Sequence, residues 1–527
     1  MRDLHFPGRS PVRATGAVVA TSQPMASAAA LALLREGGNA IDAAICAAAV
    51  LAVVEPQSTG VGGDVFCLYV PGGKGEVIAY NGAGRAPGAA HIDWYEERGI
   101  TAIASDSPHS VTIPGAIDAW CRLSADHGRT PLERVLAPAI HYAEKGYVVH
   151  DRVEADWRET QVLLARDEAA ARIFLPGGRA PRAGDVHRQP ELAQTLRRIA
   201  KLGRSGFYEG EVAEDLVSRL KAAGGLHTLD DFAAAQGNYA RPVKTSYRGA
   251  EIWQMPPSNQ GLTALLMLNL LSGFDLAGLD PLSAARFHLE IEAGRLAYQV
   301  RDALIADPAK AKVDIEGLLS NAYADRLRER ISPERALELP VRAMEPSDTV
   351  YLCVVDSDRN AVSFINSTYW SFGSGLVGPK SGVVLQNRGA GFRIDRKHPN
   401  CIAPGKQPLH TIMPGMAMRD GHVLAPFGVM GGDYQPFGNV HVLTNVLDYG
   451  MDPQAAIDFP RVFHNRTAAV VERSVPPAVM RGLQQRGHAV GIAEEALGGG
   501  QMILIDWEKG TLTGGSDPRK DGLAIGY

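Results

Sequence analysis

The sequence has no apolar run long enough to cross a membrane. The longest, Ala43–Val54, ends at Glu55-Pro56, whereas a membrane-spanning helix needs about 20 apolar residues. The N-terminal residues 1–16 carry arginines but no apolar segment after them, so we expect no signal peptide. These absences predict a cytoplasmic protein without a membrane partner.

Cysteine is scarce, and the usual metal-binding spacings are missing. The 527 residues include five cysteines, which are scattered through mostly apolar stretches. An odd, scattered set is typical of buried free thiols in a reducing compartment. Neither a Cys-x-x-Cys nor a His-Glu-x-x-His spacing occurs, so we expect no metal site.

An excess of charge of one sign is also lacking. Lys and Arg number 53 and Asp and Glu number 58, which gives a formal net charge of −5. A chain this balanced offers no electrostatic reason to bind nucleic acid. The hydrophobic fraction of 45% is that of a globular protein, and the length allows two or three domains.

Local signals define elements near the N-terminus. Residues 16–22 have the pattern of a buried strand, and residues 25–36 have a helical composition that Gly37-Gly38 ends. Asn39 is a suitable cap for a second helix over 40–54. The region therefore predicts a strand followed by two helices.

The pattern changes near residue 349. Helical patterns dominate 131–221 and 283–329, whereas the chain from 350 onward is rich in strands and glycine. We therefore divide the chain into a helix-rich region, 1–348, and a β-rich region, 349–527.

The β-rich region opens with a predicted hairpin. Strands over 350–356 and 361–369 flank a four-residue turn. If the first and last turn residues pair, paired positions sum to 717, which places Thr349 opposite Thr368 and beside Ser367. A slip of one residue would still leave hydroxyls near that of Thr349.

Thr349 is a weak signal by itself, because threonine at the start of a strand is usually structural. Its place at the change of pattern, with hydroxyls opposite, makes it a candidate nucleophile. If the Asp348–Thr349 bond were cut, Thr349 would gain an α-amine with a reference pKa of about 8. A useful fraction of that amine is neutral near pH 7–8 and takes the proton from the residue's own hydroxyl. Nucleophile and base would then be one residue.

Two glycine clusters have both a structural and a functional interpretation. Gly60–Gly63 follows a helix and precedes a strand, the reverse of a dinucleotide-binding fingerprint. It is either a tight turn or the backbone wall of a small-molecule pocket. In the second cluster, the adjacent Gly431 and Gly432 either form a turn or direct two backbone N–H groups at one oxygen, as in an oxyanion hole.

With several further motifs, these residues resemble the γ-glutamyltransferase family (γ-glutamyl transpeptidases and glutathione hydrolases) of N-terminal-nucleophile hydrolases. The resemblance runs nearly end to end. The segments that carry it are Gly37–Ala44, Val54-Glu55-Pro56, Gly60–Gly63, Met255–Ser258, Asp348-Thr349, Val354–Asp356, Asn360–Val362, Phe372–Gly375, Pro460-Arg461 and Gly514–Arg519.

The resemblance implies a fold, a maturation step and a set of catalytic residues. The fold is a four-layer αββα sandwich, and the chain is a proenzyme that cuts itself between Asp348 and Thr349. Thr349 then attacks an amide, Ser367 matches a hydroxyl that supports the nucleophile, and Gly431 and Gly432 match the oxyanion hole. The partners are a small-molecule amide and the two subunits of the same chain, with a homo-oligomer left open. The mechanism needs no metal or organic cofactor.

The substrate-binding positions depart from the family pattern. The arginine that grips a glutamate carboxylate falls on Ala83, with Arg85 two residues on, and the acid that binds the ammonium falls on Gly391. The other positions hold Tyr369, Arg388, and the pair His410-Thr411. Losing an acid and gaining an arginine favours an anion over an ammonium, and the pattern looks more like the oxamate-amidohydrolase-like branch.

We therefore expect an amidohydrolase that hydrolyses a small, carboxylate-bearing, oxamate-like amide through a threonine acyl-enzyme. Structural alternatives stay open: Arg388 as a salt-bridged surface residue, Arg85 as a loop residue and His410 as a packed core histidine. Two other functions also stay open. One is a γ-glutamyltransferase or glutathione hydrolase that acts on γ-glutamyl amides, and the other is an uncleaved protein that only binds a ligand.

Overall fold

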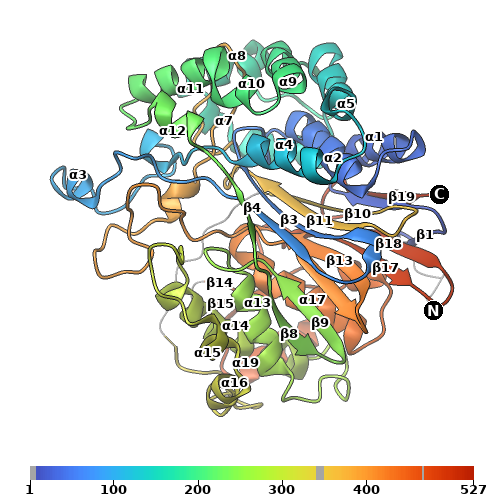
Figure 1. Ribbon diagram of the computed structural model, residues 1–527. Coiled ribbons are helices and arrows are strands. Elements are labelled where there is room, and N and C mark those ends of the chain that lie inside the picture. Colours follow the sequence, from blue (N-terminus) through green and yellow to red (C-terminus); the bar gives the residue numbers. More distant parts are fainter. Residues whose placement is uncertain (1–7, 340–348, 466–467) are drawn as a thin grey trace.

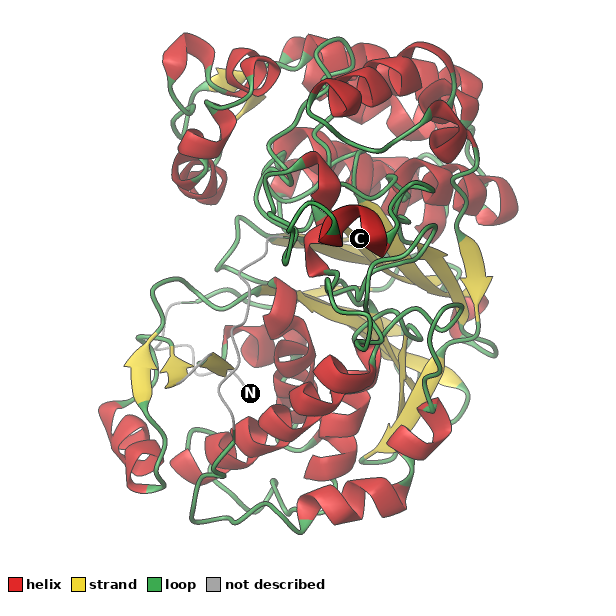
Figure 2. Cartoon of the chain, turned by 90° about the vertical axis from the view of Figure 1, so that its left-hand side faces the viewer, coloured by secondary structure: helices red, strands yellow, loops and turns green. Residues whose placement is uncertain are grey.

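The computed structural model describes residues 8–339, 349–465 and 468–527. Two seven-stranded sheets lie face to face, and helices cover the outer face of each sheet (Figure 1). Figure 2 shows the same arrangement from the side, with the strands between two helical layers. The predicted four-layer αββα sandwich is therefore confirmed.

The first sheet holds the predicted nucleophile hairpin near its centre. Its order is β19-β2-β10-β11-β3-β4-β7, with antiparallel neighbours throughout. Its strands are β2 (Val18–Thr21), β3 (Asp64–Val70), β4 (Ile78–Gly82), β7 (Asn238–Ala240), β10 (Val350–Val355), β11 (Ala361–Ser367) and β19 (Leu523–Gly526). The central strands β10 and β11 are buried along their whole length, because layers cover both of their faces.

The second sheet has the order β1-β18-β17-β13-β12-β9-β8, again antiparallel. Its strands are β1 (Val12–Ala14), β8 (Val243–Tyr247), β9 (Ala250–Gln254), β12 (Gly415–Arg419), β13 (His422–Met430), β17 (Gly499–Asp506) and β18 (Thr511–Ser516). Two small sheets are formed by β5 (Tyr147–Val148) with β6 (Val186–His187), and by β14 (Val462–Asn465), β15 (Ala468–Val471) and β16 (Val490–Ile492).

The helices divide between the two outer layers. Those over the first sheet or beside it are α1 (Pro24–Arg35), α2 (Ala40–Val54), α3 (Ile92–Glu96), α4 (Ala116–His127), α5 (Leu132–Lys145), α6 (Asp151–Glu159), α7 (Gln161–Leu164), α8 (Glu168–Phe174), α9 (Pro190–Leu202), α10 (Ser205–Tyr208), α11 (Gly210–Ala222) and α12 (Leu229–Ala233). Those on the side of the second sheet are α13 (Gly261–Leu271), α14 (Ala284–Leu304), α15 (Ile315–Leu319), α16 (Asn321–Arg328), α17 (Gln435–Leu447), α18 (Pro453–Asp458) and α19 (Pro477–Gln485).

Strand β10 shows how the alternation of side chains builds two separate cores. Leu352 and Val354 pack in the cluster shared with α1 and α2, whereas Tyr351 and Cys353 pack in the cluster between the sheets. All five cysteines are free thiols, as predicted, but only Cys46, Cys67 and Cys353 are buried, whereas Cys121 and Cys401 are partly exposed. No helix in the described part of the chain is long and apolar enough to cross a membrane.

The predicted N-terminal elements are confirmed. The helix expected over 40–54 is α2, and the Asn39 side chain accepts hydrogen bonds from the N–H groups of Ile41 and Asp42. The Asp42 carboxylate accepts the Asn39 N–H at 3.0 Å, which completes a capping box. Gly37 ends the preceding helix region with φ +100°, a conformation that glycine adopts without strain.

The hairpin forms, but its predicted register is wrong by one residue. Val350 pairs with Asn366 and Val355 with Ala361, so paired positions sum to 716. The loop contains three residues, with Arg359 at φ +63°, because Asp356 and Asn360 already bond through their backbones.

Each sheet takes strands from both sides of Thr349. The regions 1–348 and 349–527 thus interleave within the same layers. Their division into two subunits stays a prediction.

Candidate active site

Thr349 immediately precedes β10 and faces the last residue of β11. Its hydroxyl donates to the Ser367 hydroxyl oxygen at 3.2 Å, and both residues are fully buried. Ser367 Oγ also accepts the backbone N–H of Tyr369 at 2.8 Å. Tyr369 has φ +83°, which is uncommon for a non-glycine residue. The β11 end therefore turns sharply around the Ser367 hydroxyl.

The glycine-rich turn Gly60–Gly63 lies directly behind Ser367. A Cβ on Gly63 would lie 2.3 Å from the Ser367 carbonyl oxygen, so only glycine permits this approach. The turn leads into β3, where Asp64 is the register partner of Ser367. The turn is thus a backbone wall next to the hairpin.

Strand β13 brings the second glycine cluster to the same region. It packs over β10, where a Cβ on Gly428 would lie 2.4 Å from the Tyr351 ring. Gly431 and Gly432 follow the end of β13 with φ +116° and +56°. The Gln260 side chain donates to the carbonyl oxygens of Gly432, at 3.0 Å, and of Thr411, at 2.6 Å. This one amide therefore holds the glycine pair beside Thr411.

A cavity of about 390 Å³, here named the Thr411 cavity, lies at this point. Tyr369, Gly391, Thr411 and Asp433 line it together with Trp370. Three positions that the sequence assigns to substrate binding thus share one cavity, including the position where the family acid is replaced by glycine.

Arg388 lies behind the wall that Tyr369 and Thr411 form. Its Nη1 donates to Thr411 Oγ1 at 2.6 Å, and its guanidinium carbon stands 4.0 Å from the centre of the Tyr369 ring. The side chain is buried, and its Nε and Nη2 have no hydrogen-bond partner among the described residues. Burial lowers the pKa of Arg388 to about 10. No carboxylate in the described part of the chain forms an ion pair with it, so it is not a salt-bridged surface residue.

His410 is buried next to Thr411 and pairs with an acid. Its Nε2 donates to Asp64 at 2.9 Å, and its ring packs edge-on against Phe66. Burial, followed by repulsion from Arg388, lowers the pKa of His410 to about 4. The ring is therefore neutral at pH 7.

Arg85 lies elsewhere. It lines another cavity with Ala83 and Gly405, donates to the Gly405 carbonyl at 3.2 Å, and stands 3.8 Å from Asp307. The structure therefore does not bring Arg85 to the Thr411 cavity. The predicted cleavage residue Asp348 lies outside the described residues.

Sequence reasoning missed the buried partners of these residues. Arg301 pairs with Asp433 at 2.6 Å and also donates to Gln260. Because these contacts join α14, the residue before α13 and the segment after β13, no local spacing could reveal them. The only hint was Asp433 itself, which adjoins the glycine cluster.

One group of potential metal ligands was also missed, because its spacing is His-x-x-x-Glu with a distant histidine. His288, Glu292 and His488 offer ligand atoms within 4.8 Å of one another. These atoms are already engaged, since His288 Nδ1 and His488 Nε2 bond at 2.7 Å and Arg295 donates to Glu292 at 2.8 Å. These contacts explain the cluster as a buried network of hydrogen bonds.

Comparisons with known proteins in sequence all point to one family. A profile of the gamma-glutamyltranspeptidase family matches residues 26–527. The glutathione hydrolase-like YwrD proenzyme of Bacillus subtilis is 39% identical over 523 residues, which cover 97% of this chain and 98% of that protein. The oxamate amidohydrolase proenzyme of Klebsiella pneumoniae is 37% identical over 519 residues, or 95% and 97% of the two chains.

A solved structure extends the agreement to three dimensions. The cephalosporin acylase from Bacillus halodurans is 38% identical, superposes with a TM-score of 0.93, and covers 100% of this chain and 99% of its own. The matches in sequence and in fold both run the length of the molecule. The chain therefore belongs to the gamma-glutamyltranspeptidase family, as an enzyme of the N-terminal-nucleophile hydrolase type.

Proposed function

We propose that this protein is a self-cleaving amidohydrolase that acts on a small, carboxylate-bearing amide, with Thr349 as nucleophile. Cleavage begins when the Thr349 hydroxyl oxygen attacks the Asp348 carbonyl carbon. The peptide C–N bond breaks as an ester forms, and water then hydrolyses the ester. The products are subunits 1–348 and 349–527, the second with a free Thr349 amine. The description of two relatives as proenzymes supports this maturation.

The same atoms then serve hydrolysis of the substrate. The neutral α-amine of Thr349 takes the proton of its own hydroxyl, whose oxygen attacks the amide carbon. The N–H groups of Gly431 and Gly432 stabilise the developing oxyanion. The C–N bond breaks, the amine leaves with the proton, and water releases the acid from the ester. Ser367 orients the nucleophile, because it accepts the Thr349 hydroxyl at 3.2 Å.

The observation that carries the substrate class is the buried Arg388 without an anionic partner in the described part of the chain. An unpaired buried charge is costly, and a bound carboxylate offsets that cost. The Thr411 hydroxyl, which accepts from Arg388, links the guanidinium to the cavity. We assign the substrate carboxylate to Arg388 and Thr411, with Tyr369 as the adjoining wall and the neutral His410, held by Asp64, as their support.

The test starts with the purified chain incubated near pH 8. Denaturing gels and N-terminal mass spectrometry should show two fragments, the smaller beginning with Thr349, and Thr349→Ala should stay whole. Oxamate and related carboxylate amides should be hydrolysed faster than γ-glutamyl-p-nitroanilide. Efficient hydrolysis of the γ-glutamyl compound would instead favour a glutathione-hydrolase-like activity, and activity that survives Thr349→Ala would exclude this mechanism.

A further inference from the structure

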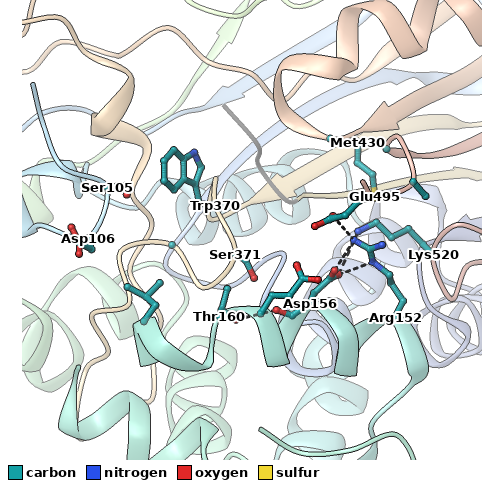
Figure 3. A pocket seen from close by; sticks show the side chains of 16 residues that line it. Ser105, Asp106, Arg152, Asp156, Thr160, Trp370, Ser371, Met430, Glu495 and Lys520 are labelled. Atoms are coloured by element: carbon teal, nitrogen blue, oxygen red, sulfur yellow. Dashed lines mark hydrogen bonds and ion pairs between the residues drawn. The ribbon is translucent and has the colours of Figure 1, made fainter. Parts of the chain in front are cut away.

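A second cavity shares lining residues with the Thr411 cavity, and Figure 3 shows its side chains. It has a volume of about 330 Å³ and is here named the Arg152 cavity. Ser105 and Trp370 line both cavities, while Gly431 lines the Arg152 cavity and Asp433 the Thr411 cavity. Because Gly431 and Asp433 flank Gly432 in the chain, both cavities reach the segment of the proposed oxyanion site.

One side of the Arg152 cavity carries unused hydrogen-bonding groups. Trp370 Nε1 and Ser371 Oγ are buried atoms with no hydrogen-bond partner among the described residues. Elsewhere in the cavity, Leu163 and Met430 add apolar surface, and Met430 lies beside Glu495 and Lys520 (Figure 3). Such a mixed wall suits a ligand that has both apolar and polar parts.

The opposite wall is ionic (Figure 3). Arg152 pairs with Asp156 at 2.6 Å and with Glu495 at 3.5 Å, and Lys520 stands 3.7 Å from Asp156. Charges of both signs are thus fixed in place before any ligand arrives. A polar or zwitterionic group can bind there without bringing its own counter-ion.

The size of the cavity bears on the leaving group. A primary amide releases ammonia, which is the size of a water molecule and needs about 30 Å³ of liquid volume. The Arg152 cavity exceeds this by roughly tenfold. A site built only for primary amides has no use for such a space beside the oxyanion glycines.

We propose that the Arg152 cavity receives the leaving amine of an N-substituted amide, with its apolar part against Trp370 and its polar end at the Arg152–Asp156–Lys520 network. The inference rests on the proposed function and refines its substrate class. The amide C–N bond breaks, the acyl group stays on Thr349 Oγ, and the amine leaves with one proton into this cavity. An amino acid is the simplest amine with these properties.

The experiment compares two amides with the same carboxylate-bearing acyl group. One is the primary amide and the other is the amide of glycine. Leu163→Trp and Thr160→Trp each place a large ring in the Arg152 cavity. Val162→Trp is the matched control, because Val162 adjoins Leu163 on α7 but is 71% exposed. Thermal unfolding shows which variants keep their fold.

The wild-type protein should hydrolyse the glycine amide with a higher kcat/KM than the primary amide. Leu163→Trp should lower kcat/KM for the glycine amide at least tenfold more than for the primary amide, and Thr160→Trp should do the same. Val162→Trp should change both by less than twofold. Equal losses on both substrates, or a wild-type preference for the primary amide, would overturn this inference alone. Hydrolysis of neither amide would overturn the proposed function and this inference together.

Discussion

At the scale of single residues, Arg388 is the sharpest test of the substrate class. Arg388→Met removes a charge-assisted contact worth about 1.5–3 kcal/mol, so KM for a carboxylate amide should rise by about 10- to 150-fold. The free energy of unfolding should change by less than about 1 kcal/mol, because removing a buried unpaired charge offsets the lost contacts with Thr411 and Tyr369. Steady-state kinetics and urea unfolding measure the two effects. A large loss of stability with unchanged KM would make Arg388 a structural residue instead.

Ser367 tests how the proposed nucleophile, Thr349, is oriented. Ser367→Ala removes the acceptor of both the Thr349 hydroxyl and the Tyr369 N–H. A misplaced nucleophile can cost about 100-fold in rate, so kcat should fall by about this factor while KM changes little. Ser367→Thr keeps the hydroxyl and should retain most of kcat. If the alanine variant matches wild type in kcat, the contact has no role in positioning.

At the scale of elements, local signals predicted more than long-range ones. Helix α2 has the predicted bounds because its cap, Asn39, and its stop, Pro56, both lie in the adjoining sequence. The predicted register of the hairpin was wrong by one residue. The loop length depends on hydrogen bonds that Asp356 makes, and the spacing of residues in the sequence does not reveal them. The register error did not separate the hydroxyls of Thr349 and Ser367. Contacts such as Gln260 with Gly432 join distant elements, so the sequence alone could not show them.

Asp356 ties the β10–β11 hairpin to α2. Its buried carboxylate accepts from the N–H groups of Ala40, Asp358 and Asn360 and from the Asn360 side chain. Asp356→Ala leaves these donors unpaired and should lower the free energy of unfolding by about 3 kcal/mol. Asp358→Ala is the control two residues away, because its 2.8 Å ion pair with Arg129 is exposed and worth less than about 1 kcal/mol. Urea unfolding of the two variants should therefore differ clearly, and equal losses would show that Asp356 is no anchor.

At the scale of the whole molecule, composition and family motifs predict the layered fold well. They predict poorly which ionisable side chains are buried between the layers and whether those side chains are charged. The two seven-stranded sheets and their outer helices bury ionisable side chains whose neighbouring sequence does not indicate burial. His187, His227 and His410 come from three distant segments and are all buried. Because the surroundings of each histidine depend on how the layers pack together, the pKa of each ring follows from the folded structure and not from the local sequence.

These histidines predict that the protein loses stability in mild acid. Burial lowers the pKa of His187, His227 and His410 to about 4, against about 6.5 in the unfolded chain. Between these values the unfolded state binds more protons, so the free energy of unfolding falls as pH falls from about 6.5 to about 4. Each histidine contributes up to about 1.4 kcal/mol per pH unit. Burial raises the pKa of Asp356, Asp458 and Asp521, which opposes part of this slope.

The prediction is best measured by urea unfolding between pH 7 and pH 4.5 in the Thr349→Ala chain, which should remain a single polypeptide. His227→Gln removes one buried titrating ring whose Nε2 meets the Val111 carbonyl at 2.8 Å, so it should flatten the pH slope by up to about 1.4 kcal/mol per unit. His141→Gln, which replaces an exposed ring on α5, is the matched control. A slope that is the same in all three proteins would mean that His227 is not kept neutral by the fold. A flattened slope in His227→Gln alone would show that closing the layers, rather than any local motif, sets the charge state of the interior.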